Sequence, residues 1–185
     1  MLGCLIEKQR TTPDVYPLSL NALRLACNQS TNREPVVDYD EPAIRDALQR
    51  LSAKGWVRLA SGPSSRAVKY RHLFDEALGL SGPEILLLTV LMLRGAQTVG
   101  ELKSRTERLH RFDSLAEVDE ALHALAVREL AMRLERRPGQ KEERWEHRLG
   151  DTAEAAPPAQ SSLEERVRTL EEQVAELREQ VRQSQ

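Results

Sequence analysis

The chain has few aromatic residues, few cysteines and no long hydrophobic run. Phe, Trp and Tyr make up 4% of its 185 residues, so the core has to be built mostly from Leu, Val and Ala. The longest apolar run, around residues 85–93, is much shorter than the roughly 20 residues of a membrane helix. No signal-peptide pattern opens the sequence, so we expect a cytoplasmic protein.

Motifs of the common enzyme classes are also missing. The sequence contains no glycine-rich phosphate loop, no Gly-x-Ser-x-Gly turn and no His-Glu-x-x-His helix. Its four histidines have no metal-ligand spacing, and two cysteines are too few for a disulfide framework or a zinc cluster. We expect Cys4 and Cys27 to be small core residues, or else to meet across two packed helices as a redox pair. The sequence therefore predicts a protein that is not an enzyme and needs no metal or cofactor.

Charge is distributed unevenly along the chain. The net charge is only -2, which excludes a uniformly basic nucleic-acid coat protein. Residues 1–74 nevertheless contain 11 Lys/Arg against 7 Asp/Glu, whereas residues 75–150 contain 12 against 14, and residues 151–185 contain 4 against 8. Only the first block favours a polyanionic partner.

Two segments 74 residues apart share one pattern. Residues 47–56 read Ala-Leu-x-x-Leu-x-x-Lys-x-Trp, and residues 121–130 read Ala-Leu-x-x-Leu-x-x-Arg-x-Leu. In both, apolar residues recur at the i, i+4 and i+7 spacing of one helical face. Each helix is followed by a predicted β-hairpin: strands 56–60 and 67–74 around a turn at 61–65, and strands 131–136 and 143–148 around Pro138-Gly139.

Two further helices are predicted before each of these helices. They cover residues 2–9, 18–28, 81–94 and 98–109, with Asn28 as a left-handed C-cap and Ser81 as an N-cap. Three helices followed by a hairpin form a winged helix. We therefore predict a mainly α fold with small β-wings (α+β), made of winged-helix domains at 1–74 and 75–150 that pack on each other. The first helix is shorter than its counterpart, so we expect it to continue upstream of Met1; a shorter helix is the alternative.

The C-terminal part differs in composition from the rest. Residues 151–162 form a linker rich in Ala, Pro and Ser, and residues 163–182 carry a heptad pattern. Val at every a position and Leu at every d position favour a parallel dimeric coiled coil, although docking on the chain's own globular part is an alternative. The seam consists of Leu163, Val167, Leu170, Val174, Leu177 and Val181.

Residues 1–150 resemble a known bacterial family. The segments Leu-Gly-Cys-Leu-Ile-Glu-Lys (2–8), Pro-Leu-Ser-Leu-Asn-Ala-Leu (17–23), Ala-Cys-Asn-Gln (26–29) and Asn-Arg-Glu-Pro-Val (32–36) are similar to the YceH-like family. Val15 stands where that pattern has an aromatic residue. The resemblance implies two winged-helix units; the family has no established activity, so it implies no function.

The first unit carries the candidate DNA-binding residues. The third helix of a winged helix commonly enters the major groove while the wing contacts the backbone. The helix face opposite Ile44, Leu48 and Leu51 also includes Asp46, which would repel phosphates. An ordinary solvated face is the alternative interpretation. The candidates are Arg45, Gln49 and Arg50 on the helix, Arg66, Lys69 and Arg71 on the wing, and Asn32 and Arg33 on the preceding loop.

The second unit does not repeat this pattern. Its third helix presents Glu117, Asp119 and Glu120 outward, and an acidic face repels phosphate. We expect this unit to pack against the first unit or to bind a protein. The sequence thus favours a DNA-binding or regulatory homodimer led by the first unit, with a protein-interaction scaffold as the alternative.

Overall fold

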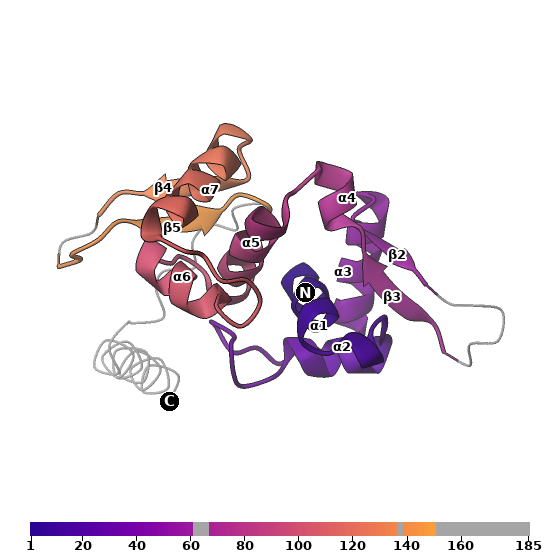
Figure 1. The fold of residues 1–185 in the computed structure, drawn as a ribbon. Coiled ribbons are helices and arrows are strands. Elements are labelled where there is room, and N and C mark those ends of the chain that lie inside the picture. Colours follow the sequence, from indigo (N-terminus) through magenta and orange to yellow (C-terminus); the bar gives the residue numbers. More distant parts are fainter. Residues whose placement is uncertain (61–66, 137–138, 151–185) are drawn as a thin grey trace, which may run out of the picture. The chain divides into compact units, whose positions relative to one another are not determined.

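The computed structural model describes residues 1–60, 67–136 and 139–150 (Figure 1). Within this part of the chain the fold is α+β, with seven α-helices, one short 3-10 helix and two small antiparallel sheets. Met1–Leu149 form one compact unit. The predicted linker and coiled coil, residues 151–182, lie outside the described residues.

The first half of this unit contains four α-helices and a three-stranded sheet. Its core is helical because Leu, Ile and Ala recur on one face of each helix. In chain order the elements are α1 (Leu2–Thr11), the 3-10 helix η1 (Pro13–Val15), β1 (Leu18–Ser19), α2 (Leu20–Cys27), α3 (Glu41–Ala53), β2 (Val57–Leu59), β3 (Lys69–His72) and α4 (Phe74–Leu78).

The second half repeats the order of three helices followed by two strands. Its elements are α5 (Gly82–Arg94), α6 (Val99–Thr106), α7 (Leu115–Val127), β4 (Ala131–Leu134) and β5 (Arg144–His147). The strands β4 and β5 pair in register, with Ala131 opposite His147 and Leu134 opposite Arg144.

Side-chain caps explain where most of these helices begin. Ser19, Asp40 and Ser114 each accept a hydrogen bond from the backbone N–H three residues later. Ser81 and Thr98 form complete capping boxes with Glu84 and Glu101, which satisfy two free N–H groups at each helix start. These caps fix the helix boundaries locally, and the cap predicted at Ser81 is confirmed.

The two halves share one hydrophobic core, and α1 packs directly on α5 within it. Leu5 and Ile6 of α1 are fully buried, as are Leu87 and Leu91 of α5. The two helices approach closely at Gly3, because a Cβ atom there would lie 3.0 Å from Leu93 Cγ and 3.3 Å from Met92 Cβ. Glycine at this position therefore sets the distance between the helices.

Each half contains one tryptophan beside its sheet. The Trp56 ring lies edge-on to Phe74 with the ring centroids 5.0 Å apart, and Lys54 Nζ lies 4.9 Å from the Trp56 centroid. Trp145 of β5 is 3% exposed and exchanges backbone hydrogen bonds with Gln97. Both rings therefore pack against the hydrophobic core beside their sheets.

Several boundaries differ from those predicted. Leu18 and Ser19 do not belong to the second helix, because their backbone pairs with Tyr70 and Lys69 of β3. The return strand ends at His72, and Phe74 instead begins the unpredicted helix α4, where its ring is fully buried. Helix α6 ends at Thr106 rather than at Leu109.

The end of α2 also needs a correction. Asn28 is the C-cap residue, but its φ of -88° and ψ of 6° are not left-handed. Its side chain bonds instead to the Asp38 carboxylate and to both backbone groups of Tyr39. The amide therefore acts by fastening the loop that leads to α3.

Among the described residues, no helix combines the length and apolar character needed to span a membrane. In the same part of the chain, no group of three or more His, Cys, Asp and Glu side chains is arranged to hold a metal ion.

Candidate nucleic-acid interface

The outer face of α3 is polar but locally neutral. Arg45 pairs with Glu41, and Arg50 pairs with Asp46, each across one helical turn. Gln49 lies exposed on the same helix. The two predicted cations are thus balanced by two carboxylates of their own helix, so α3 presents polar groups without an excess of positive charge.

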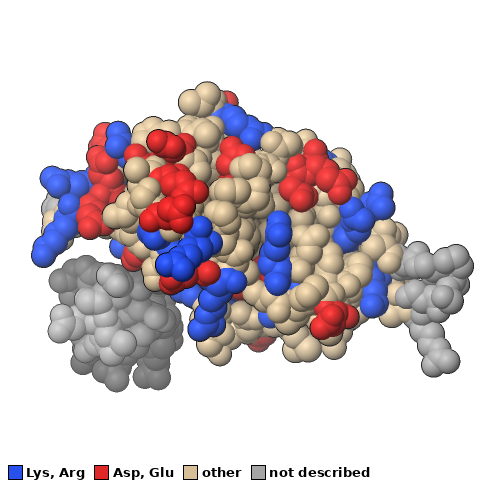
Figure 2. All heavy atoms as spheres, in the orientation of Figure 1, with Lys and Arg blue, Asp and Glu red and all other residues tan. Residues whose placement is uncertain are grey.

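The β2–β3 hairpin is different because its charge has one sign. From Lys54 to His72 the sequence contains five Lys and Arg residues and no Asp or Glu. Figure 2 shows Lys and Arg atoms along the side of the molecule where Figure 1 places β2 and β3. Positive charge in the first half is therefore concentrated on the hairpin rather than on the helix.

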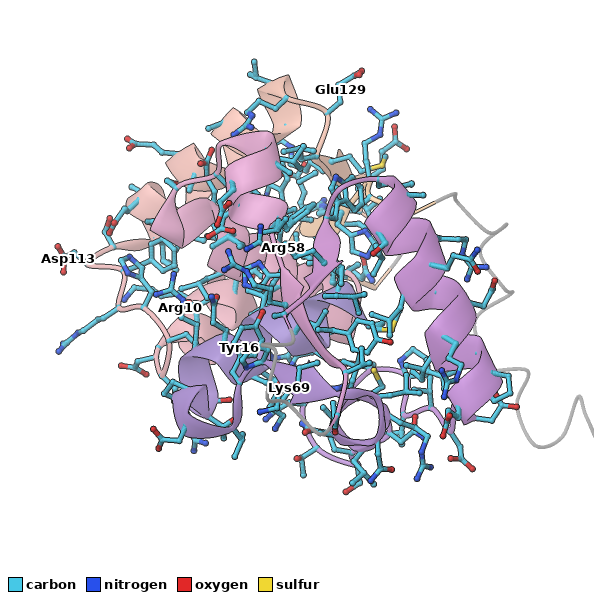
Figure 3. The ribbon with its side chains drawn as sticks, turned by 90° about the vertical axis from the view of Figure 1, so that its right-hand side faces the viewer. Arg10, Tyr16, Arg58, Lys69, Asp113 and Glu129 are labelled. Carbon is cyan, nitrogen blue, oxygen red and sulfur yellow. The ribbon has the colours of Figure 1, made fainter. Side chains whose placement is uncertain are left out.

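The strand register places three cations on one face of this hairpin. Val57 pairs with His72, and both are buried, so these two residues mark the core-facing side. Side chains alternate between the faces of a strand. Arg58, Lys69 and Arg71 therefore share the opposite face, and Figure 3 shows Arg58 and Lys69 on the side of the molecule that carries the hairpin.

Arg58 and Arg71 lie directly opposite each other in the register. Like charges in this position destabilise a strand pair unless an opposite charge balances them. Arg71 also pairs with Glu76 at 2.9 Å, which balances one of the two charges in part. The remaining positive charge on this face suits a bound anion.

The loop residues Asn32 and Arg33 are not part of this surface. Arg33 is buried, and its guanidinium is held by the Glu7 carboxylate and the Ala26 carbonyl. It cannot reach a phosphate, so its assignment from sequence as a nucleic-acid contact has to be corrected. Asn32 has a positive φ of 57°, and its Oδ1 accepts a hydrogen bond from Arg94.

Other predicted site residues lie where the structure does not describe the chain. Arg66 falls in the segment 61–66 between β2 and β3. The whole predicted dimer seam, Leu163, Val167, Leu170, Val174, Leu177 and Val181, falls beyond residue 150.

The third helix of the second half, α7, carries the acidic face that the sequence indicated. Glu120 is exposed, and Asp119 lies 3.4 Å from His123 Nδ1. Glu117 accepts a hydrogen bond from the backbone of Asp113 and so helps to fix the start of α7. These carboxylates would repel a phosphate backbone.

The two cysteines meet inside the first half. Both are 2% exposed. Interaction with the Cys27 thiol lowers the pKa of the Cys4 thiol, although burial acts in the opposite direction. They are core residues, as expected, and the redox pair stays a prediction.

Sequence reasoning missed Arg58 as a candidate. The alternation of Val57, Arg58 and Leu59 could have identified it, because it places Arg58 on the solvent face of a strand. The partner of that strand could not be aligned without the register, so the pairing of Arg58 with Arg71 required the structure.

Comparison with known proteins gives the family of the chain. A family model described as "Protein of unknown function, DUF480" matches residues 1–140, and the chain belongs to this family. It is similar to a UPF0502 protein of Serratia proteamaculans, with 46% identity over 171 residues, or 89% of this chain and 79% of the relative.

Two further relatives support the assignment. A UPF0502 protein of Pseudomonas aeruginosa is 48% identical over 168 residues, which cover 90% of this chain and 75% of the relative. The UPF0502 protein YceH of Escherichia fergusonii is 44% identical over 184 residues, which cover 92% of this chain and 86% of the relative. The resemblance to the YceH-like family is therefore confirmed.

Proposed function

We propose that this chain is a cytoplasmic, non-enzymatic DNA-binding or regulatory protein whose first half contacts duplex DNA. In this proposal each half is a winged-helix unit, with α3 and α7 as the third helices and the β2–β3 and β4–β5 hairpins as wings. The repeated order of three helices and two strands supports the assignment. The first wing supplies phosphate contacts, and α3 supplies polar groups to a groove.

The observation that carries this proposal is the like-charged face of the first hairpin. Arg58 opposite Arg71, with Lys69 two residues away on the same strand face, concentrates charge where no carboxylate of the hairpin offsets it. Guanidinium groups bind phosphate oxygens through pairs of parallel hydrogen bonds. A DNA backbone laid against this face would remove the repulsion between the two arginines.

Helix α3 has a smaller electrostatic role than the hairpin, because its arginines are already paired with carboxylates. Breaking the Arg50–Asp46 or Arg45–Glu41 pair to reach a phosphate would leave a carboxylate close to the DNA. Gln49 has no charge to balance, and a glutamine amide can bond to the edge of an adenine. We therefore propose that the wing binds phosphates and that Gln49 contacts a base.

The test is a fluorescence-anisotropy titration of random duplex DNA with the full chain at about 50 and about 200 mM salt. The wild type should bind more weakly at the higher salt, because each phosphate contact releases counterions. Replacing Arg58, Lys69 and Arg71 together by Gln should weaken binding at low salt by at least about tenfold and flatten the salt dependence by roughly 0.9 in log–log slope per lost contact.

Two control variants make the outcome specific. One variant carries Glu41→Gln, Arg45→Gln, Asp46→Asn and Arg50→Gln, which removes both ion pairs of α3 without changing its net charge. The other carries Arg133→Gln and Arg148→Gln, which removes two positive charges from the second half. Both should retain affinity within about threefold, as expected for charges already paired at the surface. Salt-independent binding by the wild type, or equal affinity of the hairpin variant, would overturn the proposal.

The second candidate function is a protein-interaction scaffold. It is favoured by the acidic face of α7 together with Leu115 and Val127, which are 53% and 86% exposed on the same helix. Exposed apolar groups beside charged ones are typical of protein contacts. Absence of DNA binding at low salt would make this the leading function.

We further propose that the chain is a homodimer through residues 163–182. The proposal rests on the heptad of Val and Leu, and a dimer would offer two basic hairpins to one duplex, which raises affinity through avidity. Truncation after Gly150 should lower the mass measured by light scattering from that of a dimer to that of a monomer. An unchanged dimer mass would place the contact elsewhere.

A further inference from the structure

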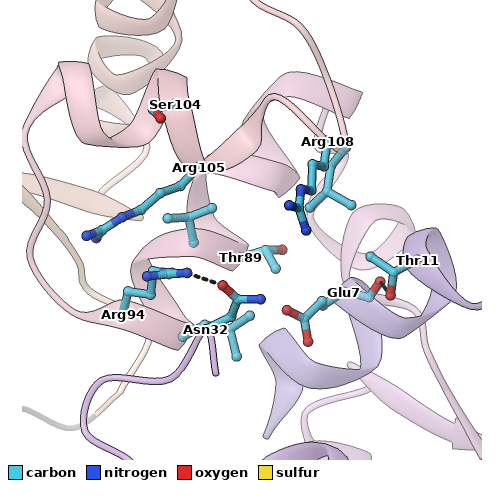
Figure 4. A pocket seen from close by; sticks show the side chains of 11 residues that line it. Glu7, Thr11, Asn32, Thr89, Arg94, Ser104, Arg105 and Arg108 are labelled. Atoms are coloured by element: carbon cyan, nitrogen blue, oxygen red, sulfur yellow. Dashed lines mark hydrogen bonds between the residues drawn. The ribbon is translucent and has the colours of Figure 1, made fainter. Parts of the chain in front are cut away.

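A cavity of about 310 Å³ lies between the two halves of the compact unit (Figure 4). One side is formed by α1 and the loop at Asn32, and the other by α5, α6 and the segment after α6. Figure 2 shows Lys and Arg atoms gathered on the surface over α6. The volume is at the small end of the range for ligand sites, which begins near 300 Å³.

Three arginines line this cavity: Arg94 from the end of α5, Arg105 from α6, and Arg108 from the segment after it. Within the described part of the chain, none of the three forms an ion pair with a carboxylate. Arg94 donates a hydrogen bond to Asn32 Oδ1, and Arg105 Nη1 is buried without a hydrogen-bond partner. An unbonded buried guanidinium nitrogen is costly, because it has lost water without gaining a partner.

The arginines are close enough to affect one another. Burial lowers the pKa of Arg94, and the positive charge of Arg105 lowers it further, whereas Glu34 and Glu7 act in the opposite direction. Burial and the neighbouring charge of Arg105 therefore both oppose the positive charge of Arg94. A bound anion would reverse them.

Two of the acidic groups near the cavity, Glu7 and Glu101, already have cationic partners. Glu7 lines the wall, but both of its oxygens accept hydrogen bonds from Arg33. Glu101 faces Arg105 from the same helix, but it is paired with Arg144 at 2.9 Å. The cavity therefore keeps an excess of positive charge on Arg94, Arg105 and Arg108.

We propose that this cavity binds a small ligand that carries a phosphate group. Planar guanidinium groups match phosphate oxygens with bidentate hydrogen bonds, and three arginines line this cavity. The Ser104 hydroxyl and the Asn32 amide supply further polar contacts, and Val90, Leu93 and Leu109 form an apolar wall for the organic part of the ligand. A small phosphomonoester fits both the charge and the volume.

The site is recessed, which favours a small molecule over a nucleic-acid backbone. Thr89, which lines the cavity floor, is 1% exposed, and Leu93 is 8% exposed. A duplex is too wide to bring its phosphates against such residues. Since the walls come from both halves, the ligand would contact the two halves at once.

The test is calorimetric titration of the full chain with inorganic phosphate, pyrophosphate, phenyl phosphate and citrate. Phenyl phosphate should bind with half-saturation at or below about 1 mM and more tightly than inorganic phosphate, because its ring reaches the apolar wall. Arg94→Gln and Arg105→Gln should each weaken binding at least about tenfold, the loss expected for charged hydrogen bonds. Arg24→Gln, which makes the same charge change on α2 outside the cavity, should leave binding unchanged.

Circular dichroism and melting curves of each variant separate loss of binding from loss of folding. Absence of saturable binding by any phosphate probe to the folded wild type would overturn the proposal. The proposal would also fail if Arg24→Gln weakened phosphate binding as much as Arg94→Gln and Arg105→Gln do. The probes would then be attracted only by the overall charge of the protein. Citrate binding as tight as that of phenyl phosphate would replace a phosphate site with a general anion site, and displacement of phenyl phosphate by duplex DNA would assign the arginines to the nucleic-acid interface.

Discussion

Arg33 and Glu7 form a bidentate ion pair inside the first half of the molecule. Arg33 Nη2 lies 2.6 Å from Glu7 Oε2, and Arg33 Nη1 lies 3.2 Å from Oε1. The guanidinium also donates to the Ala26 carbonyl, so the pair ties α1, the end of α2 and the following loop together. Burial disfavours the charge on Arg33, but its hydrogen bond to Glu7 prevails and raises its pKa.

Removing either partner of this pair should be strongly destabilising. We expect Glu7→Gln or Arg33→Met to lower the free energy of unfolding by about 3–5 kcal/mol, because each leaves one buried charge without its partner. The double variant Glu7→Leu with Arg33→Met should recover much of the loss, since it leaves no charge unpaired. Urea unfolding of the three variants measures this coupling; additive losses in the double variant would contradict it.

The close approach of α1 and α5 predicts opposite effects for two glycines. Gly3→Ala should destabilise the fold by about 1–2 kcal/mol, because its methyl group would overlap Leu93 Cγ at 3.0 Å. Gly100→Ala in α6 should stabilise it by about 0.5–1 kcal/mol, since the nearest atom is Thr98 Oγ1 at 3.9 Å and alanine favours helix. Thermal unfolding monitored by circular dichroism gives both values, and a stabilised Gly3→Ala variant would show that the helices can move apart freely.

His72 predicts a loss of stability in weak acid. Burial lowers its pKa below 6.5, and Arg71 and Arg10 lower it further, while Asp75 and Glu76 act in the opposite direction. Below about pH 6.5 the unfolded chain gains a proton that folded His72 resists, so stability falls as the pH falls toward the lowered pKa. The slope from this group cannot exceed about 1.4 kcal/mol per pH unit.

The comparison is between the wild type, His72→Gln and the exposed control His123→Gln. Melting temperatures at pH 7 and 5.5 should differ less for His72→Gln than for the other two proteins, because that variant lacks the buried titrating ring. The half-buried His147 contributes equally to all three. Identical shifts in all three proteins would mean that His72 is protonated in the folded state as readily as in the unfolded one.

The cysteine pair predicts slow thiol reactivity. Cys4 and Cys27 are each 2% exposed, so a thiol reagent such as DTNB should modify neither in the folded protein despite the lowered pKa of Cys4. In denaturant both should react within minutes. Rapid modification of one thiol without denaturant would indicate that the contact between α1 and α2 opens locally.

The sequence was sufficient where the determining interactions are local. The cap at Ser81 and the end of α5 at Gly95 follow from residues within one or two turns. The pairing of Leu18 with Tyr70 joins residues more than fifty positions apart, so a helix appeared to extend through it. The burial of Arg33 depends on Glu7 in another helix, and nothing in the composition of the loop distinguishes it from a solvent-exposed cation.

The same difference between local and long-range interactions decides which parts of the candidate site could be predicted from the sequence. Charge balance along the chain indicated the first half, and that remains the basis of the proposal. The neutrality of α3 could have been inferred, since Glu41 and Asp46 each precede an arginine by four residues. The cavity that Arg94, Arg105 and Arg108 line could not be predicted, because it depends on how α1 and the Asn32 loop close the space opposite them.

The placement of the two tryptophans provides an intrinsic optical probe in each half of the compact unit. Trp56 is partly exposed beside Phe74, whereas Trp145 is almost completely enclosed, so the two indoles should emit at different wavelengths. Replacing one at a time by Phe leaves a single fluorophore that follows the unfolding of its own half. Because α1 and α5 share one core, the two emission signals should disappear at the same denaturant concentration.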